Sequence, residues 1–182
     1  MCRYGTLPTG RTSSRRLNSS FTLIMPFIHL TTFIAAPRER VFDLSRSVDV
    51  HKASMKRHHE KVVDGTITGL MNLGDMVTWT AKHLFKQRRL KIKVTKLQAP
   101  EYFTDEQEEG EFRMMKHEHY FKSIQNGTIM IDQFHFETPY GWLGSLVNSF
   151  YLERHMTELL KGRNAMIKQI AEGNLWTQYL NR

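Results

Sequence analysis

The sequence has only one cysteine, Cys2, among its 182 residues. A lone cysteine excludes an internal disulfide and any zinc site built from cysteines. This scarcity is typical of proteins from a reducing compartment, so we expect a cytoplasmic location. Long apolar runs are also missing: no stretch approaches the roughly 20 residues that cross a bilayer, and we expect no membrane-spanning helix. The composition is that of a globular domain with enough apolar residues to form a core.

Acidic residues are absent from the first 24 positions, where Arg3, Arg11, Arg15 and Arg16 supply half of the net charge of +8. This segment is also rich in serine and threonine without hydrophobic periodicity, which predicts a disordered extension. We interpret it as a flexible segment upstream of a start at Met25, with an organelle transit peptide as the alternative. The predicted folded domain is residues 25–173, followed by a C-terminal tail at 174–182.

The longest regular pattern lies near the C-terminus, in residues 139–172. Apolar residues recur there at spacings of three and four, as on one face of a long amphipathic helix. Pro139 and Gly141 mark its expected start, and Gly173 its end. A helix of about 30 residues spans roughly 45 Å, which favours one held by a curved sheet. The basic residues that we expect to interact favourably with the negative end of its dipole are Lys161, Arg163 and Lys168.

The preceding chain predicts a strand over residues 27–34, a helix that begins at Pro37, and a second short helix over residues 48–55. A short strand at Val62 and Val63 follows, and clear β-structure begins at Asp75. Pro100 precedes a strand whose inward set is either Phe103, Asp105 and Gln107 or the alternate residues. The polar stretch His58, His59 and Glu60 could suggest a metal site, but adjacent side chains point apart, so we expect a solvated surface.

Two hairpins fix the predicted faces of the sheet. A turn near Lys86 and Gln87 would place Trp79 opposite Val94. Asn126 and Gly127 between alternating runs indicate a type I′ turn, with Gln125 opposite Thr128. That register makes His119 and Asp132 diagonal neighbours. The residues predicted to face the long helix include Trp79, Ile92, His119 and Phe134, and those predicted to face away include Thr80, Lys93, Tyr120 and Gln133.

Polar side chains on the predicted inner face are the main functional signal, because buried polar groups are costly unless they have partners. Three interpretations stay open: a core with satisfied histidines, a cavity whose polar groups orient an apolar ligand, or a metal or acid–base site. His117 and His119 share one face of a strand, as chelation requires, but no further ligands are recognisable, and we predict no metal. The candidate ligand-binding residues are Trp79, His83, Ile92, Met115, His117, His119, Asp132, Phe134, Phe136 and Phe150.

Five motifs carry a resemblance to a known family. They are GDMVTWTAKHL (74–84), FTDEQ (103–107), FRMMKHEHYF (112–121), MIDQFHFETPYGWLG (130–144) and RNAMIKQIAE (163–172). In this order they resemble the START-like, Bet v 1-like SRPBCC superfamily, and most closely its bacterial ligand-binding members. The resemblance covers about residues 26–172 and implies an α+β helix-grip fold: a curved seven-stranded antiparallel sheet around a long C-terminal helix, with two short helices after the first strand. It also implies that the first strand pairs with the last.

The resemblance does not specify an activity, because the superfamily includes carriers, cyclases, aromatases and hydroxylase domains. The sequence contains no Rieske-type motif, no two-histidine–carboxylate signature, no nucleophile elbow and no phosphate-binding loop. We therefore expect a monomer or homodimer that binds a hydrophobic small molecule such as a lipid, a polyketide-like compound or an aromatic compound, without a cofactor. The alternative is a cyclase, dehydratase or hydrolase, with acid–base candidates His117, His119 and Asp132.

A third function, nucleic-acid binding, would use the outer face of the first hairpin. The basic residues there are Lys82, Arg88, Arg89, Lys91 and Lys93. No aromatic residues are interleaved with them, so a solvated sheet face is the better interpretation, and we expect no nucleic-acid partner.

Overall fold

The computed structural model describes residues 27–55, 61–83, 86–137 and 142–180, and the side chains of 81–83, 86–87 and 142–150 are outside the description. The expected extension at residues 1–24 and the stretch His58, His59 and Glu60 therefore lie outside the described residues. Seven antiparallel strands form one sheet in the order β1-β7-β6-β5-β4-β3-β2. The strands are β1 (Phe27–Ile34), β2 (Lys61–Gly65), β3 (Met76–His83), β4 (Lys86–Gln98), β5 (Tyr102–Glu109), β6 (Met114–Ile124) and β7 (Gly127–Glu137).

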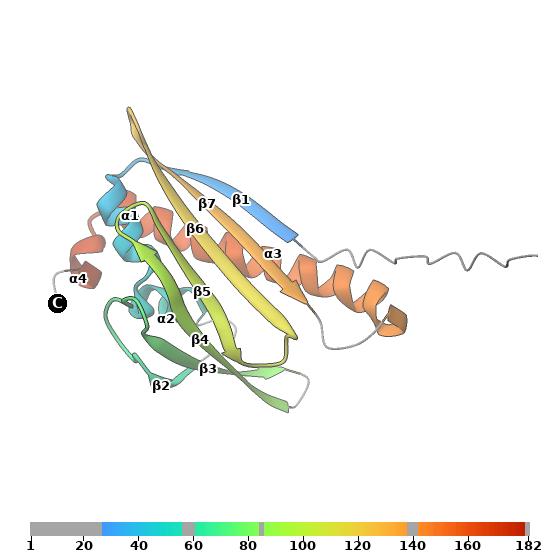
Figure 1. The fold of residues 1–182 in the computed structure, drawn as a ribbon. Coiled ribbons are helices and arrows are strands. Elements are labelled where there is room, and N and C mark those ends of the chain that lie inside the picture. Colours follow the sequence, from blue (N-terminus) through green and yellow to red (C-terminus); the bar gives the residue numbers. More distant parts are fainter. Residues whose placement is uncertain (1–26, 56–60, 84–85, 138–141, 181–182) are drawn as a thin grey trace, which may run out of the picture.

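Four helices accompany the sheet: α1 (Arg38–Ser45), α2 (Val48–Met55), α3 (Trp142–Glu172) and α4 (Trp176–Leu180). Helix α3 runs along one side of the curved sheet, and α1 and α2 lie near the end of the sheet where α3 ends (Figure 1). The predicted α+β helix-grip fold is thus confirmed, including the two short helices after the first strand and the pairing of β1 with β7. Within the described residues, no helix is long and apolar enough to cross a membrane.

The register of the β6–β7 hairpin differs from the predicted one by two residues. Gly127 pairs with Ile124, so the loop is Gln125 and Asn126 rather than Asn126 and Gly127. Position 127 requires glycine because of a tertiary contact. A Cβ there would lie 2.3 Å from the carbonyl oxygen of Ile34 at the end of β1. Because the shift is even, every side chain keeps its predicted face. His119 consequently lies directly opposite Asp132 instead of diagonal to it.

The β3–β4 register is also wrong in the prediction, by four residues. Trp79 pairs with Leu90 rather than Val94, and His83 pairs with Lys86. The polar residues from Lys86 onward do not form the turn but begin β4, because a strand with one solvated face tolerates them. This shift is again even and preserves the faces. Thr80 is buried although it alternates with Trp79, and its hydroxyl donates to the carbonyl oxygen of Lys61.

The inner face divides into two parts. Near the end of α3, a core of fully buried side chains includes Phe42 of α1, Phe121 of β6 and Ile167 of α3. The other part holds Trp79, Val94, Met115 and other apolar residues, together with polar groups. Helix α4, which occupies much of the predicted tail, packs against the first part through partly buried side chains that include Trp176.

Candidate functional site

A cavity of about 130 Å³ lies between the inner face of the sheet and the helices α2 and α3. Strands β3 and β4 contribute Trp79 and Ile92, and helix α3 contributes Leu160. Most of its lining is apolar, and its polar side chains come from both the sheet and the helices. Those polar residues are Ser45, Arg46, Ser47, His51, Asp105, His117 and Arg163.

Five of the ten residues predicted to bind a ligand line this cavity: Trp79, Ile92, Met115, His117 and Phe134. Three others, His119, Asp132 and Phe136, are fully buried on the same face and do not line it. The side chains of His83 and Phe150 lie outside the described residues, and the structure does not test their predicted role.

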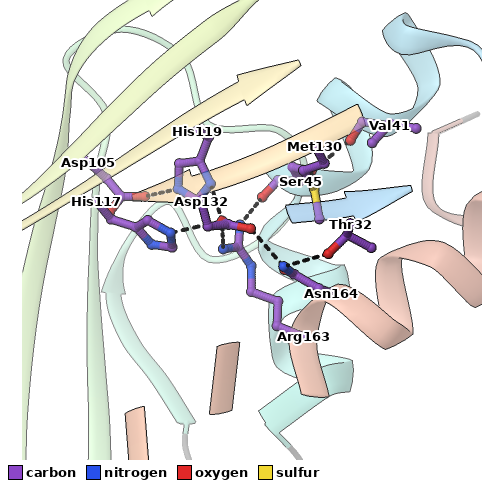
Figure 2. A network of polar contacts seen from close by, with 10 residues as sticks. All are labelled: Thr32, Val41, Ser45, Asp105, His117, His119, Met130, Asp132, Arg163 and Asn164. Atoms are coloured by element: carbon purple, nitrogen blue, oxygen red, sulfur yellow. Dashed lines mark hydrogen bonds and ion pairs between the residues drawn. The ribbon is translucent and has the colours of Figure 1, made fainter. Parts of the chain in front are cut away.

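Asp132 is the centre of the polar network beside the cavity (Figure 2). Its Oδ1 accepts a hydrogen bond from Nε2 of His117 at 2.9 Å, and its Oδ2 accepts one from Nδ2 of Asn164 at 2.7 Å. Nδ1 of His119 lies 3.0 Å from the same Oδ1, but in a direction unfavourable for a hydrogen bond. The carboxylate therefore contacts side chains from β6 and α3 at once. Its position links the sheet to the long helix.

Asp105 of β5 is the second carboxylate of the network. Its Oδ2 lies 3.3 Å from Nε2 of His119 in a hydrogen bond, and the His119 ring stacks on Phe103 with centroids 4.1 Å apart. The inward side chains of β5 are therefore Phe103, Asp105 and Gln107, which is the first of the two sets that the sequence allowed. Asp105 was not predicted as a site residue, because its strand could be read in either phase from the sequence alone.

Arg163 and Asn164 of α3 were also missed as site residues. Arg163 was expected to interact favourably with the negative end of the helix dipole, but its side chain is buried. Its Nη2 donates to the carbonyl oxygen of Ser45 at 2.7 Å, and its Nη1 lies 3.8 Å from Oδ1 of Asp132. No basic residue occupies the last turn of α3. A signal was present, because residues 163 and 164 continue the three–four spacing between Leu160 and Ile167.

Both carboxylates are held in the ionised form. Burial alone raises the pKa of Asp132, but the hydrogen bond from His117 and the close approach of His119 outweigh burial and hold the pKa well below its usual value. Asp105 behaves similarly: burial raises its pKa, but the hydrogen bond with His119 and the charges of His119, His117 and Arg163 together lower the pKa below its usual value. The cavity is therefore bordered by fixed negative charge, with the guanidinium of Arg163 close to Asp132.

Two histidines of the cavity wall are neutral at pH 7. Burial, followed by repulsion from His119, lowers the pKa of His117 to about 4, although Asp132 opposes the shift. Burial and then the charge of Arg163 lower the pKa of His51 to about 3; its ring packs on Trp79 with centroids 4.0 Å apart. Because neutral His117 donates through Nε2, its Nδ1 carries a lone pair and can accept a hydrogen bond.

One group within the described residues has the composition and closeness that a metal ion requires. Potential ligand atoms of Asp105, His117 and His119 all lie within 4.8 Å of one another. The sequence gives no two-histidine–carboxylate signature, since Asp105 is on a different strand from the two histidines. The tertiary structure nevertheless brings such a set together.

Comparison with known proteins identifies the fold. No protein-family model matches the chain, and no curated protein is significantly similar to it. Among solved structures, TTHA0849 from Thermus thermophilus has a TM-score of 0.61 at 20% identity, with 78% of this chain and 97% of that chain covered. The ginseng major latex-like protein 151 from Panax ginseng has a TM-score of 0.57 at 12% identity, with 82% and 99% covered.

A third similar structure is protein Ms6760 from Mycobacterium smegmatis, with a TM-score of 0.60 at 15% identity; 80% of this chain and 90% of that chain are covered. At such identities the likeness concerns the fold and does not extend to activity. The TM-scores of 0.57–0.61, with most of each chain covered, show that these structures share the overall fold of this chain. The chain thus shares the helix-grip fold of these solved structures.

Proposed function

We propose that this protein binds a small, mostly apolar molecule with one polar end in the cavity between the sheet and α3. The observation that carries the proposal is the cavity of about 130 Å³, whose apolar wall meets the polar side chains of His117, Asp105 and Arg163. An apolar pocket with a few convergent polar groups is the usual form of a small-molecule site. The Bet v 1-like fold of the solved relatives is compatible with this proposal.

The volume favours a ligand part about the size of one aromatic ring. A dry engineered cavity of about 150 Å³ in another protein binds benzene, which is close to the volume available here. A longer ligand, such as a lipid, would need the cavity to widen. We therefore favour an aromatic compound over a lipid or an extended polyketide among the predicted ligand classes.

The polar groups of the wall define what the polar end of the ligand should contain. Nδ1 of His117 makes no hydrogen bond within the described residues and accepts one, so it suits a hydroxyl or N–H group. The indole N–H of Trp79 is buried without a hydrogen-bond partner among the described residues. Because this N–H has almost no surface open to the cavity, His117 alone sets the polar requirement. A phenol satisfies it, since its hydroxyl can donate to Nδ1.

The test compares p-cresol with toluene, which has the same ring without the hydroxyl. Titration of the full chain in the presence of EDTA, followed by NMR chemical shifts of cavity methyl groups, should show p-cresol binding more tightly by about tenfold, as one hydrogen bond predicts. His117→Leu should remove this difference. Equal affinities of the wild type for the two compounds would contradict the assigned polar end.

A matched pair of variants tests the location. Ile92 lines the cavity, whereas Ile131 of β7 lies on the opposite face of the sheet. Ile92→Trp should fill the cavity and abolish binding of both compounds, and Ile131→Trp should leave binding unchanged. If both variants retain binding while their circular dichroism spectra match the wild type, the ligand does not bind in this cavity.

An enzyme of the cyclase, dehydratase or hydrolase type is the second candidate. The observation in its favour is the hydrogen bond of 2.9 Å between His117 and Asp132, because a base oriented by a carboxylate is a common catalytic pair. A general base works best with a pKa near the working pH, and burial lowers the pKa of His117 to about 4. Binding is therefore favoured over catalysis.

If the site were catalytic, His117→Gln would abolish turnover of a candidate substrate but leave its binding nearly intact.

A further inference from the structure

We propose that Asp105, His117 and His119 form a binding site for a divalent transition-metal ion, with Zn²⁺ as the best-suited ion. The three side chains come from the adjacent strands β5 and β6 and offer one carboxylate oxygen and two imidazole nitrogens within 4.8 Å of one another. Imidazole and carboxylate are the nitrogen and oxygen ligands that Zn²⁺ takes in proteins. The inference does not depend on the proposed organic ligand.

The separation of one pair of candidate ligand atoms matches a tetrahedral site. Two ligands bound at roughly 2.1 Å to a tetrahedral Zn²⁺ are about 3.4 Å apart. Oδ2 of Asp105 and Nε2 of His119 are 3.3 Å apart. A metal ion can therefore replace the proton between these two atoms with little movement of either side chain. The rings of His117 and His119 lie close to each other, with centroids 3.8 Å apart.

Asp132 gives the second argument, because it contacts the nitrogens that the metal would not use. Nε2 of His117 donates to Oδ1 of Asp132 at 2.9 Å, which leaves Nδ1 as the ligand atom; Nδ1 of His119 is 3.0 Å from the same oxygen, which leaves Nε2. Histidines that bind a metal commonly donate their other nitrogen to a carboxylate that fixes the ring and its tautomer. Asp132 plays this part for His117 through the hydrogen bond, and its Oδ1 lies close to the other nitrogen of His119.

The surroundings leave a position for a further ligand. Asp105 and His117 line the cavity, whereas His119 is fully buried behind them. Three protein ligands with a fourth position toward a cavity are typical of catalytic zinc sites, where water or substrate takes the open position. The positive charge of Arg163 is balanced by Asp132 through the contact of 3.8 Å. An ion at this site would present its open position to a ligand oxygen in the cavity.

The experiment uses the full chain after removal of metals with EDTA and its exchange into metal-free buffer. Isothermal titration with ZnCl₂ should give one tight Zn²⁺ per chain. CoCl₂ should give intense visible absorption bands, as expected for cobalt(II) with four or five ligands. His117→Gln, His119→Gln and Asp105→Asn should each remove the tight site and these bands. Asp132→Asn, which changes only a supporting contact, should weaken Zn²⁺ binding by about 10–100-fold.

His135→Gln is the control, since His135 is partly exposed and occupies the alternate phase of β7, on the other face of the sheet. It should bind Zn²⁺ with the affinity of the wild type. Circular dichroism of each metal-free variant establishes that it is folded, and only folded variants are compared. The proposal is overturned if the folded wild type binds no Zn²⁺ or Co²⁺, or if the tight site survives in the folded His117→Gln, His119→Gln and Asp105→Asn variants. Because no organic ligand is present, this outcome is independent of the p-cresol titration.

Discussion

The two parts of the inner face are built on the same sheet and the same long helix, yet one is filled and the other is hollow. In the filled part, Phe42 of α1 lies edge-on against Phe103 and Phe121, with ring centroids 5.8 and 5.4 Å away. Helix α3 contributes Ile167 and Ile170 there. In the hollow part, the same helix contributes Leu160 and Arg163 to the wall of the cavity.

The difference between the two parts comes from which helix packs between the sheet and α3. Helix α1 supplies the aromatic side chain that fills the space between sheet and α3, whereas the ring of His51 from α2 packs on Trp79 and leaves a cavity beside it. Asp132 lies at the boundary of the two parts, with partners on both the sheet and the helix. One turn of α3, from Arg163 to Ile167, separates a charged wall from an apolar core.

The largest effect should come from emptying the filled part. Phe42 is 1% exposed, and Phe42→Ala should lower the free energy of unfolding by about 3–5 kcal/mol, because it removes a large buried side chain and leaves a void. Trp79→Ala should cost less despite the larger ring, because Trp79 already borders a cavity. Urea denaturation measures both. If Trp79→Ala lowers the free energy of unfolding more than Phe42→Ala does, the hollow part is packed as tightly around Trp79 as the filled part is around Phe42.

Acid should destabilise the hollow part through His117. Its pKa is about 4 in the folded chain against 6.5 for the unfolded reference, so above pH 6.5 neither state binds the proton. Between pH 6.5 and 4 the unfolded state binds it and the folded state does not, and stability falls by an amount on the order of 3 kcal/mol. The lowered pKa values of Asp132 and Asp105 add a loss only below about pH 4, where the unfolded carboxylates are protonated first.

The measurement is the urea midpoint of the wild type and of His117→Gln between pH 7.5 and 4.5. The variant should show a shallower decline, with the remainder due to His51, whose pKa is also lowered, to about 3. Identical slopes for the wild type and His117→Gln would mean that His117 is already protonated in the folded chain.

A smaller loss of stability should follow from changes in helix α4, which packs against the outside of the filled part. The guanidinium of Arg40 lies 4.2 Å from the ring centroid of Trp176 in α4. Trp176→Ala should cost about 1 kcal/mol, since it removes a cation–π contact and a partly buried ring. Leu175 is exposed, and Leu175→Ala should stay within about 0.5 kcal/mol of the wild type. Equal melting temperatures for all three proteins would show that α4 does not stabilise the core.

The smallest expected effect concerns residues 1–24, which lie outside the described residues. Their composition predicts a segment without fixed structure, so their deletion should leave the melting temperature unchanged. Differential scanning calorimetry of the two chains measures this. A drop of several degrees would place the segment against the folded domain.

The sequence by itself determined the elements and the faces of the strands. Helix α2 and strand β1 coincide with the predicted residues 48–55 and 27–34, because their ends carry clear turn and helix-start signals. Alternation placed His117, His119 and Asp132 inward even though both hairpin registers were wrong, since an even shift preserves every face. The inward polar set was therefore predictable before any register was known.

Only the tertiary structure decided the register and the membership of the site. The pairing register of the second hairpin shifted by two residues because Gly127 must approach Ile34 on β1, a strand far away in the sequence, and no local pattern encodes that contact. Asp105 of β5 and Arg163 of α3 line the cavity together with His117. Phe136 and His119 are fully buried and do not line it. Local periodicity fixes which way a side chain points, but packing between elements far apart in the sequence fixes what it meets and whether space remains beside it.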